Sequence, residues 1–324
     1  MPSAEWEIPP NLQPDPGDYP YDLEQVLRGV VGLKSYIPSD AFTAEILGTE
    51  RGGSGVVIRD SGLIVTIGYL ITEAETIWIT TADGRALAGH ALAYDQETGF
   101  GLVQALGRLD LPPVEIGDSD ALKVGDQVVF AAAGGRQHAV ETRVVGRQEF
   151  AGYWEYVLDE AIYTAPAHPF WGGCGLIGGD GKLMGIGSLI LQQGDGKGHR
   201  LDMNMVVPIG LLGPILDDLL AYGRVNRPAR PWLGVLATES DDELVVGGLT
   251  EDGPADKAGV KAGDRILSVN DEEVSDLAGL WRRVWASGSA GAEVKLRLMR
   301  DRGAVTLSVR SGDRAKFLKS PKLH

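Results

Sequence analysis

The sequence predicts a mostly β protein with two domains, and three observations carry this prediction. The chain has 324 residues, which is enough for two domains that each bury a core. Most of it consists of short runs rich in Val, Ile, Thr and Tyr between Asp-Gly and Gly-Gly turns, a pattern typical of β barrels and sandwiches. The segment RVNRPARPW (224–232) has two prolines and no apolar period, so it indicates a linker before a second module.

The elements before the linker are predicted from turn and helix signals. The N-terminal extension is proline-rich and contains one short helix in YDLEQVLRGV (21–30), where Asp22 can act as the cap and Gln25 follows three positions later. A second helix is predicted at 209–224, where Leu and Ile recur at helical spacing. Strands are predicted in the segments 55–71, 76–95, 124–135 and 153–165.

The composition disfavours several classes of partner. The formal net charge of −15 argues against nucleic acid and anionic membranes. No apolar run approaches the ~18 residues that cross a bilayer, so membrane insertion is not expected. The N-terminus lacks the basic start and apolar core of a secretory signal. We therefore expect a cytoplasmic protein if residue 1 is the true start, and a periplasmic one if a leader was removed.

The module after the linker contains the most specific motif. The stretch GPADKAGVKAGDRILSVNDEEV (253–274) resembles the core of a PDZ domain of the HtrA type. The resemblance implies that the loop Trp232-Leu233-Gly234-Val235 binds the terminal carboxylate of a peptide through its backbone N–H groups, while the peptide adds as a strand. The helix from Leu277 to Ala286 would form the other wall of this groove. Leu280 and Val284 are candidate groove residues, with the core as their alternative place.

The part before the linker resembles the protease domain of the HtrA or Deg serine proteases over residues 45–215. Each supporting motif is weak alone, but six occur in the family's order: GSGVVI (53–58), SGLIVT (61–66), TTADGRALAGHALAYDQETGFGLV (80–103), LPPVEIGDSDALKVGDQVV (111–129), GDGKLMGIGS (179–188) and NMVVPIG (204–210). The resemblance implies a trypsin-like double β-barrel followed by a PDZ domain. The expected boundaries are an extension at 1–40, a barrel domain at 41–223, a linker at 224–231, a PDZ domain at 232–312 and a basic tail at 313–324.

The positions that match the family's catalytic triad do not carry its residues. Tyr69 stands where the strand ending in Thr66 should lead to histidine, and Gly99 stands in place of the aspartate. Gly172 stands in place of the serine, and Phe170 replaces the glycine two residues before it. A phenol with a pKa near 10 is a poor general base at neutral pH, and a bulky residue disfavours the backbone of an oxyanion loop. The family's mechanism of proteolysis is therefore not expected here.

Other kinds of site are weighed beside the serine triad: a cysteine nucleophile, a metal site and an aromatic surface. Cys174, the only cysteine, lies two residues past the serine position and could act as a nucleophile with a base such as His168. The histidines show no metal-ligand spacing, so neither a metal nor a cofactor is expected. Tyr69, Phe170 and Trp171 are expected to cluster at the former cleft, either as filling or as an aromatic binding surface.

The resulting hypothesis is an HtrA-like pseudo-protease that binds peptide or protein C-termini through its PDZ groove. It would act as a scaffold, a regulator or a holdase. The resemblance also implies a homo-oligomer such as a trimer, or assembly with an active HtrA-type partner. The competing hypothesis is an active protease or hydrolase with a non-standard nucleophile such as Cys174.

Overall fold

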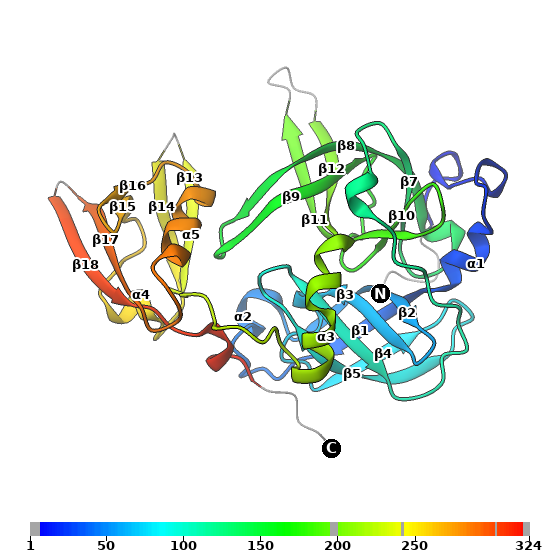
Figure 1. Cartoon of the computed structure of the whole chain (residues 1–324), viewed down its shortest axis with the longest axis horizontal. Coiled ribbons are helices and arrows are strands. Elements are labelled where there is room, and N and C mark those ends of the chain that lie inside the picture. The colour runs from blue at the N-terminus through cyan, green and yellow to red at the C-terminus, as the bar shows by residue number, and fades with distance from the viewer. Residues whose placement is uncertain (1–6, 195–199, 241–242, 302, 320–324) are drawn as a thin grey trace. The chain divides into compact units, whose positions relative to one another are not determined.

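The computed structural model describes residues 7–194, 200–240, 243–301 and 303–319. The first six residues of the N-terminal extension and the last five of the basic tail lie outside this range. The chain forms two compact units. The first contains residues 1–148, 160–225 and 319–324, and the second contains residues 149–159 and 226–318. Strands dominate both units (Figure 1), and the predicted mostly β class is confirmed.

The first barrel of the first unit closes in the strand order β1-β2-β3-β6-β5-β4. All five residues of β3 are buried, so the outer face of this strand is covered as well as its inner face. Gly62 turns the chain from β2 into β3 at a φ of 81°, a conformation that favours glycine. The strands are β1 (Val30–Tyr36), β2 (Glu50–Arg59), β3 (Leu63–Ile67), β4 (Thr76–Thr80), β5 (Ala86–Tyr94) and β6 (Phe100–Ala105).

The second barrel closes in the strand order β10-β11-β12-β9-β8-β7. Its core contains Phe130, Ile162, Leu176 and Val206, which are completely buried. Strands β8 and β9 form a long hairpin (Figure 1) whose tip, residues 149–159, belongs to the second unit. The strands are β7 (Gln127–Ala131), β8 (Ala139–Gly152), β9 (Tyr156–Ala165), β10 (Gly175–Ile177), β11 (Leu183–Gly194) and β12 (Arg200–Pro208).

Capping residues mark the start of α1 and the end of α3 in the first unit. In α1 (Leu23–Arg28) the Asp22 side chain accepts a hydrogen bond from the N–H of Gln25 at 3.0 Å. Helix α3 (Gly213–Tyr222) ends at Gly223, which has a φ of 69°. The remaining short helices of the unit are α2 (Ala44–Leu47), η1 (Pro10–Leu12), η2 (Pro16–Asp18), η3 (Gly68–Leu70), η4 (Ser119–Ala121), η5 (Arg136–His138) and η6 (Ile209–Leu211).

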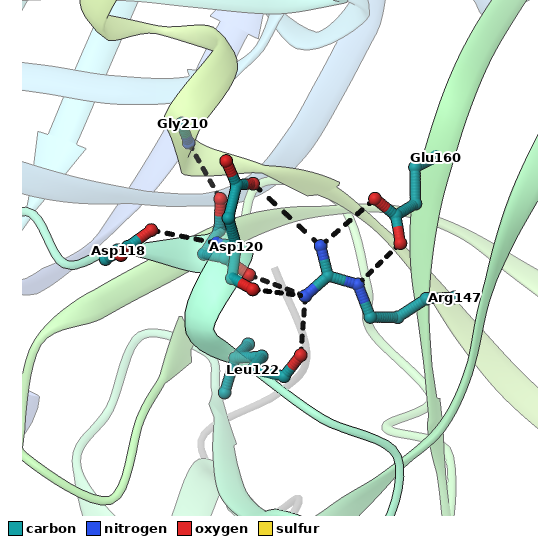
Figure 2. A network of polar contacts seen from close by, with 7 residues as sticks. Asp118, Asp120, Leu122, Arg147, Glu160 and Gly210 are labelled. Carbon is teal, nitrogen blue, oxygen red and sulfur yellow. Dashed lines mark hydrogen bonds and ion pairs between the residues drawn. The ribbon is translucent and has the colours of Figure 1, made fainter.

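An arginine fixes the base of the β8–β9 hairpin (Figure 2). The Arg147 guanidinium on β8 binds the Glu160 carboxylate on β9 through two contacts, at 2.8 and 3.2 Å. It also donates to the carbonyls of Ser119 and Leu122 at 2.8 and 2.6 Å. The Ser119 hydroxyl in turn accepts from the N–H of Gly210 at 3.0 Å. These bonds hold the two hairpin strands to η4 and η6 just before the hairpin leaves the first unit.

The second unit is a sheet in the order β13-β14-β15-β17-β18, with β16 paired to β15 and with helix α5 packed on the sheet (Figure 1). Buried and exposed residues alternate along β17, so one face of that strand lies in the core. Trp281 of α5 is completely buried there. The elements are β13 (Val235–Ser240), β14 (Glu243–Leu249), α4 (Pro254–Lys257), β15 (Arg265–Val269), β16 (Glu272–Glu273), α5 (Leu277–Ala286), β17 (Glu293–Arg300), β18 (Gly303–Arg310) and η7 (Arg314–Lys316).

Candidate peptidase centre and peptide-binding groove

The three positions that match the triad come together in the first unit. Tyr69 lies in η3 directly after β3, and Gly99 precedes β6. The N–H of Gly68 donates to the carbonyl of Gly99 at 2.7 Å, which joins these two turns. A Cβ on Gly172 would lie 2.9 Å from the Tyr69 hydroxyl oxygen. The phenol of Tyr69 therefore faces the backbone at Gly172, the residue that the sequence comparison matched to the serine.

The hydroxyl of Tyr69 is occupied by a structural hydrogen bond. It donates to the carbonyl of Ser188 at 2.8 Å. Burial raises the pKa of Tyr69 above its ordinary value, and the nearby Cys174 thiol raises it further. A phenol held in this way does not accept a proton at neutral pH.

In the loop before Gly172, the backbone N–H of Phe170 is hydrogen-bonded within the protein. The N–H of Phe170 donates to Nδ1 of His168 at 3.0 Å, although the Phe170 side chain is 42% exposed. Nε2 of His168 lies 3.1 Å from the carbonyl of His138, to which it donates. The backbone N–H of His168 donates to Oδ1 of Asn204 at 2.7 Å. The N–H that a glycine at position 170 would present to an oxyanion is thus used inside the loop.

The geometry does not favour Cys174 as a nucleophile, because its thiol is buried and its pKa is raised. Cys174 is 1% exposed, and its Sγ donates to the carbonyl of Phe170 at 2.9 Å. Burial raises the pKa of the Cys174 thiol to about 12, so the thiolate is scarce at neutral pH. The candidate base His168 has its Nδ1 occupied by the Phe170 N–H. His199, another histidine of the sequence, lies outside the described residues.

The described residues contain neither a candidate metal cluster nor a candidate membrane-spanning helix. In that part of the chain, no group of three or more His, Cys, Asp or Glu side chains could hold a metal ion. None of its helices has both the length and the apolar character needed to cross a membrane.

We expect His168 to make the first unit sensitive to acid. Burial lowers the pKa of His168 to about 4. Protonation of Nδ1 would also break the hydrogen bond that this atom accepts from the N–H of Phe170. Because the folded pKa lies below the unfolded value, this stabilisation is present above the unfolded pKa and is lost as pH falls toward 4. The loss amounts to about 3 kcal/mol between pH 6.5 and 4.

Urea unfolding across this pH range tests the expectation. His168→Gln should be less stable at pH 7 but should have a shallower decline in unfolding free energy toward pH 4. His90→Gln, on β5, removes a histidine elsewhere in the same unit and should keep the slope of the unchanged chain. Equal slopes for all three proteins would contradict the assignment.

The loop that the PDZ resemblance assigns to carboxylate binding holds a carboxylate in the structure. The N–H groups of Leu233, Gly234 and Val235 donate to Oε1 of Glu155 at 3.1, 2.7 and 3.1 Å. Gly234 has a φ of 75°, which lets the three donors converge. These backbone groups form an anion-binding nest within the second unit. The first residue of the loop, Trp232, instead packs its ring on Phe317 at 4.7 Å between centroids.

Glu155 was not found by sequence reasoning. It lies at the tip of the β8–β9 hairpin, 78 to 80 residues before the loop that binds it. Burial raises the pKa of Glu155 to about 7, while the three N–H groups and Arg314 act in the opposite direction. No local signal in the segment YWEY could have identified this role, because it depends on a pairing between distant segments.

The predicted groove residues of α5 lie in the core of the second unit. Leu280 is 1% exposed and Val284 is 0% exposed, and both belong to one cluster with Leu233 and Val235. Val157 from the hairpin tip joins the same cluster. Their proposed contact with a peptide stays a prediction, since the hairpin tip covers part of this surface.

Two family models match the chain in sequence order. Residues 53–186 match a trypsin-like peptidase domain, and residues 231–310 match a PDZ domain. A probable periplasmic serine endoprotease of the DegP-like kind from Pseudomonas fulva is 28% identical over 273 residues, with 80% of this chain and 55% of the relative covered. The chain thus has the domain combination of the HtrA-type family.

Other HtrA-type proteins give the same result. The periplasmic serine endoprotease DegP of Escherichia coli is 28% identical over 272 residues, which cover 79% of this chain and 56% of DegP. The chain thus spans little more than half the length of these curated relatives. The HtrA-type protease AlgW with a decapeptide has a TM-score of 0.54 at 21% identity, and the match covers 93% of this chain and 98% of AlgW. The serine endoprotease from Yersinia pestis has a TM-score of 0.52 at 21% identity, and the match covers 91% of this chain and 98% of the endoprotease. These two structures share the fold.

Proposed function

We propose that this HtrA-type chain captures the C-termini of peptides or proteins through the loop Leu233-Gly234-Val235 and does not cleave them. The observation that carries the proposal is the convergence of three backbone N–H groups on one carboxylate oxygen. A nest of this kind recognises a carboxylate whether a side chain or a chain terminus supplies it. The adjacent strand β13 offers the edge to which an extended peptide can add.

The peptidase frame supports capture rather than cleavage. Acyl transfer needs a nucleophile, a base within hydrogen-bond reach and donors for the oxyanion. Gly172 has no side chain, Tyr69 is a buried phenol with a raised pKa, and Phe170 gives its N–H to His168. The runner-up function is an active endopeptidase, because the curated relatives are named serine endoproteases.

The similarity to HtrA-type proteins also supports proposals on the class of ligand, the assembly and the compartment. AlgW is described with a tripeptide and with a decapeptide, and these ligands favour peptides as the class of partner for this chain. A scaffold, regulator or holdase that assembles with its own copies or with an active HtrA-type partner fits such a role. The names of the curated relatives favour the periplasm among the two compartments that the sequence left open.

A pair of matched peptides tests the proposal. We expect free-acid peptides with an apolar last residue to bind with dissociation constants in the micromolar range, about −7 to −9 kcal/mol. The same peptides with an amidated C-terminus should bind at least about tenfold more weakly, because the nest then faces a neutral group. Calorimetric titration of a C-terminal peptide library measures both. Equal affinity for the acid and amide forms would show that the nest is not part of the binding site.

A further inference from the structure

The hairpin tip contacts the groove in the way that a peptide ligand would. The Glu155 carboxylate occupies the nest of Leu233, Gly234 and Val235. Two residues earlier, the carbonyl of Tyr153 accepts a hydrogen bond from the N–H of Ala237 on β13 at 2.9 Å. A carboxylate in the nest and a backbone bond to the adjoining strand are the two contacts of peptide addition to a sheet edge. A side chain here supplies the charge that a chain terminus would otherwise bring.

Further contacts hold the hairpin tip to helix α5. Nε1 of Trp281 donates to the carbonyl of Gly152 at 2.8 Å, in a buried position. The Arg282 guanidinium bridges Glu149 and Asp159, one on each strand of the hairpin, at 2.5 Å each. Val157 adds an apolar contact in the core of the unit. The tip is therefore bound along its length and not through Glu155 alone.

The backbone at Glu155 adopts a conformation that glutamate rarely takes. Its φ is 60°, in the left-handed region that favours glycine. Such a residue persists where surrounding contacts hold it, and here the contacts are the three N–H bonds to its own side chain. The tight turn between β8 and β9 therefore presents the carboxylate at its outermost point.

We infer that Glu155 is the resident ligand of the PDZ groove, and that a peptide C-terminus binds only when it displaces the hairpin tip 149–159. This inference rests on the proposed function of the groove. A tethered ligand competes at an effective concentration set by its tether, which reaches the millimolar range for short connections. The apparent affinity for peptide is then the intrinsic affinity reduced by the fraction of open grooves.

Calorimetry on three versions of the 324-residue chain tests the inference with a free-acid peptide that has an apolar last residue. Glu155→Gln removes the internal charge and should bind the peptide at least about tenfold more tightly than the unchanged chain. Glu251→Gln removes an exposed acid from the same unit and should leave the affinity unchanged. Equal affinity for Glu155→Gln and the unchanged chain, when both bind, overturns the inference and leaves the proposed function intact. Binding by none of the three proteins overturns the proposed function.

A second variant lies outside the nest, and a second readout needs no peptide. Arg282→Ala loosens the hairpin from α5 and should raise peptide affinity by about threefold, in line with an exposed ion pair. In the absence of peptide, hydrogen exchange at the N–H groups of residues 233–235 should be at least about tenfold faster in Glu155→Gln than in Glu251→Gln. Unchanged exchange would overturn the inference even if no peptide bound, because the nest would then be closed without Glu155.

Discussion

The triple variant Tyr69→His, Gly99→Asp, Gly172→Ser is expected to remain at least about 100-fold slower in peptide cleavage than a quadruple variant that also carries Phe170→Gly. The triple variant restores the three side chains of a serine peptidase. It leaves the N–H of Phe170 bonded to Nδ1 of His168, so one donor for the oxyanion is missing. Each positioned donor contributes roughly two to three orders of magnitude to such a reaction.

The backbone explains why the loop does not adapt to the new serine. Turning the 169–170 peptide outward would leave the buried Nδ1 of His168 without its donor, at a cost of about 1–3 kcal/mol. Gly99 also has a φ of 85°, so an aspartate there starts from a strained backbone. Cleavage of a fluorogenic peptide gives the rates, with Escherichia coli DegP as the active control. Equal rates for the triple and quadruple variants would show that Phe170 does not block the oxyanion site.

Gly234→Val is expected to abolish peptide capture, with at least about a 100-fold loss of affinity. The residue has a φ of 75°, where a β-branched side chain is strongly disfavoured. Its Cβ would lie 3.1 Å from Cβ of Thr250 and 3.2 Å from the Trp232 ring. The backbone must move, and the three N–H groups then no longer converge.

A neighbouring glycine provides the control for this variant. Gly247→Ala on β14 places a Cβ at 3.5 Å or more from its neighbours and needs no unusual φ. We expect it to bind peptide as the unchanged chain does, by the same calorimetry. Unaltered binding by a folded Gly234→Val protein would place the peptide site elsewhere in the chain.

The sequence predicted the second unit well because its signals are local. The proline at the start of α4 and the glycines after it are signals within a few residues, and α5 spans the predicted Leu277–Ala286. The cap of α5 was not predicted. The Asp276 side chain accepts a hydrogen bond from the N–H of Gly279 at 2.6 Å, as a cap should. The double barrel needed the family resemblance, because each of its strand motifs is short and common.

The contacts that decide the site could not be predicted, for a physical reason. Whether the N–H of Phe170 faces the cleft or His168 depends on the orientation of one peptide unit, which the residue types do not specify. The bond between Glu155 and Gly234 joins residues 79 positions apart and depends on where a long hairpin ends. The assignment of Tyr69, Gly99 and Gly172 to the triad positions, by contrast, rests on residue identities within short motifs and stays a prediction.

The central claim, capture without cleavage, is tested most directly by following the peptide itself through the titration. Free-acid peptide is incubated with a stoichiometric amount of the 324-residue chain for about a day at about 37 °C. The bound fraction is then recovered and analysed by mass spectrometry. The account predicts that the bound peptide has its original mass, and that the amidated form is largely absent from the bound fraction. Recovery of the free-acid peptide as two fragments, in amounts that grow with time and exceed those from a protein-free incubation, would contradict it.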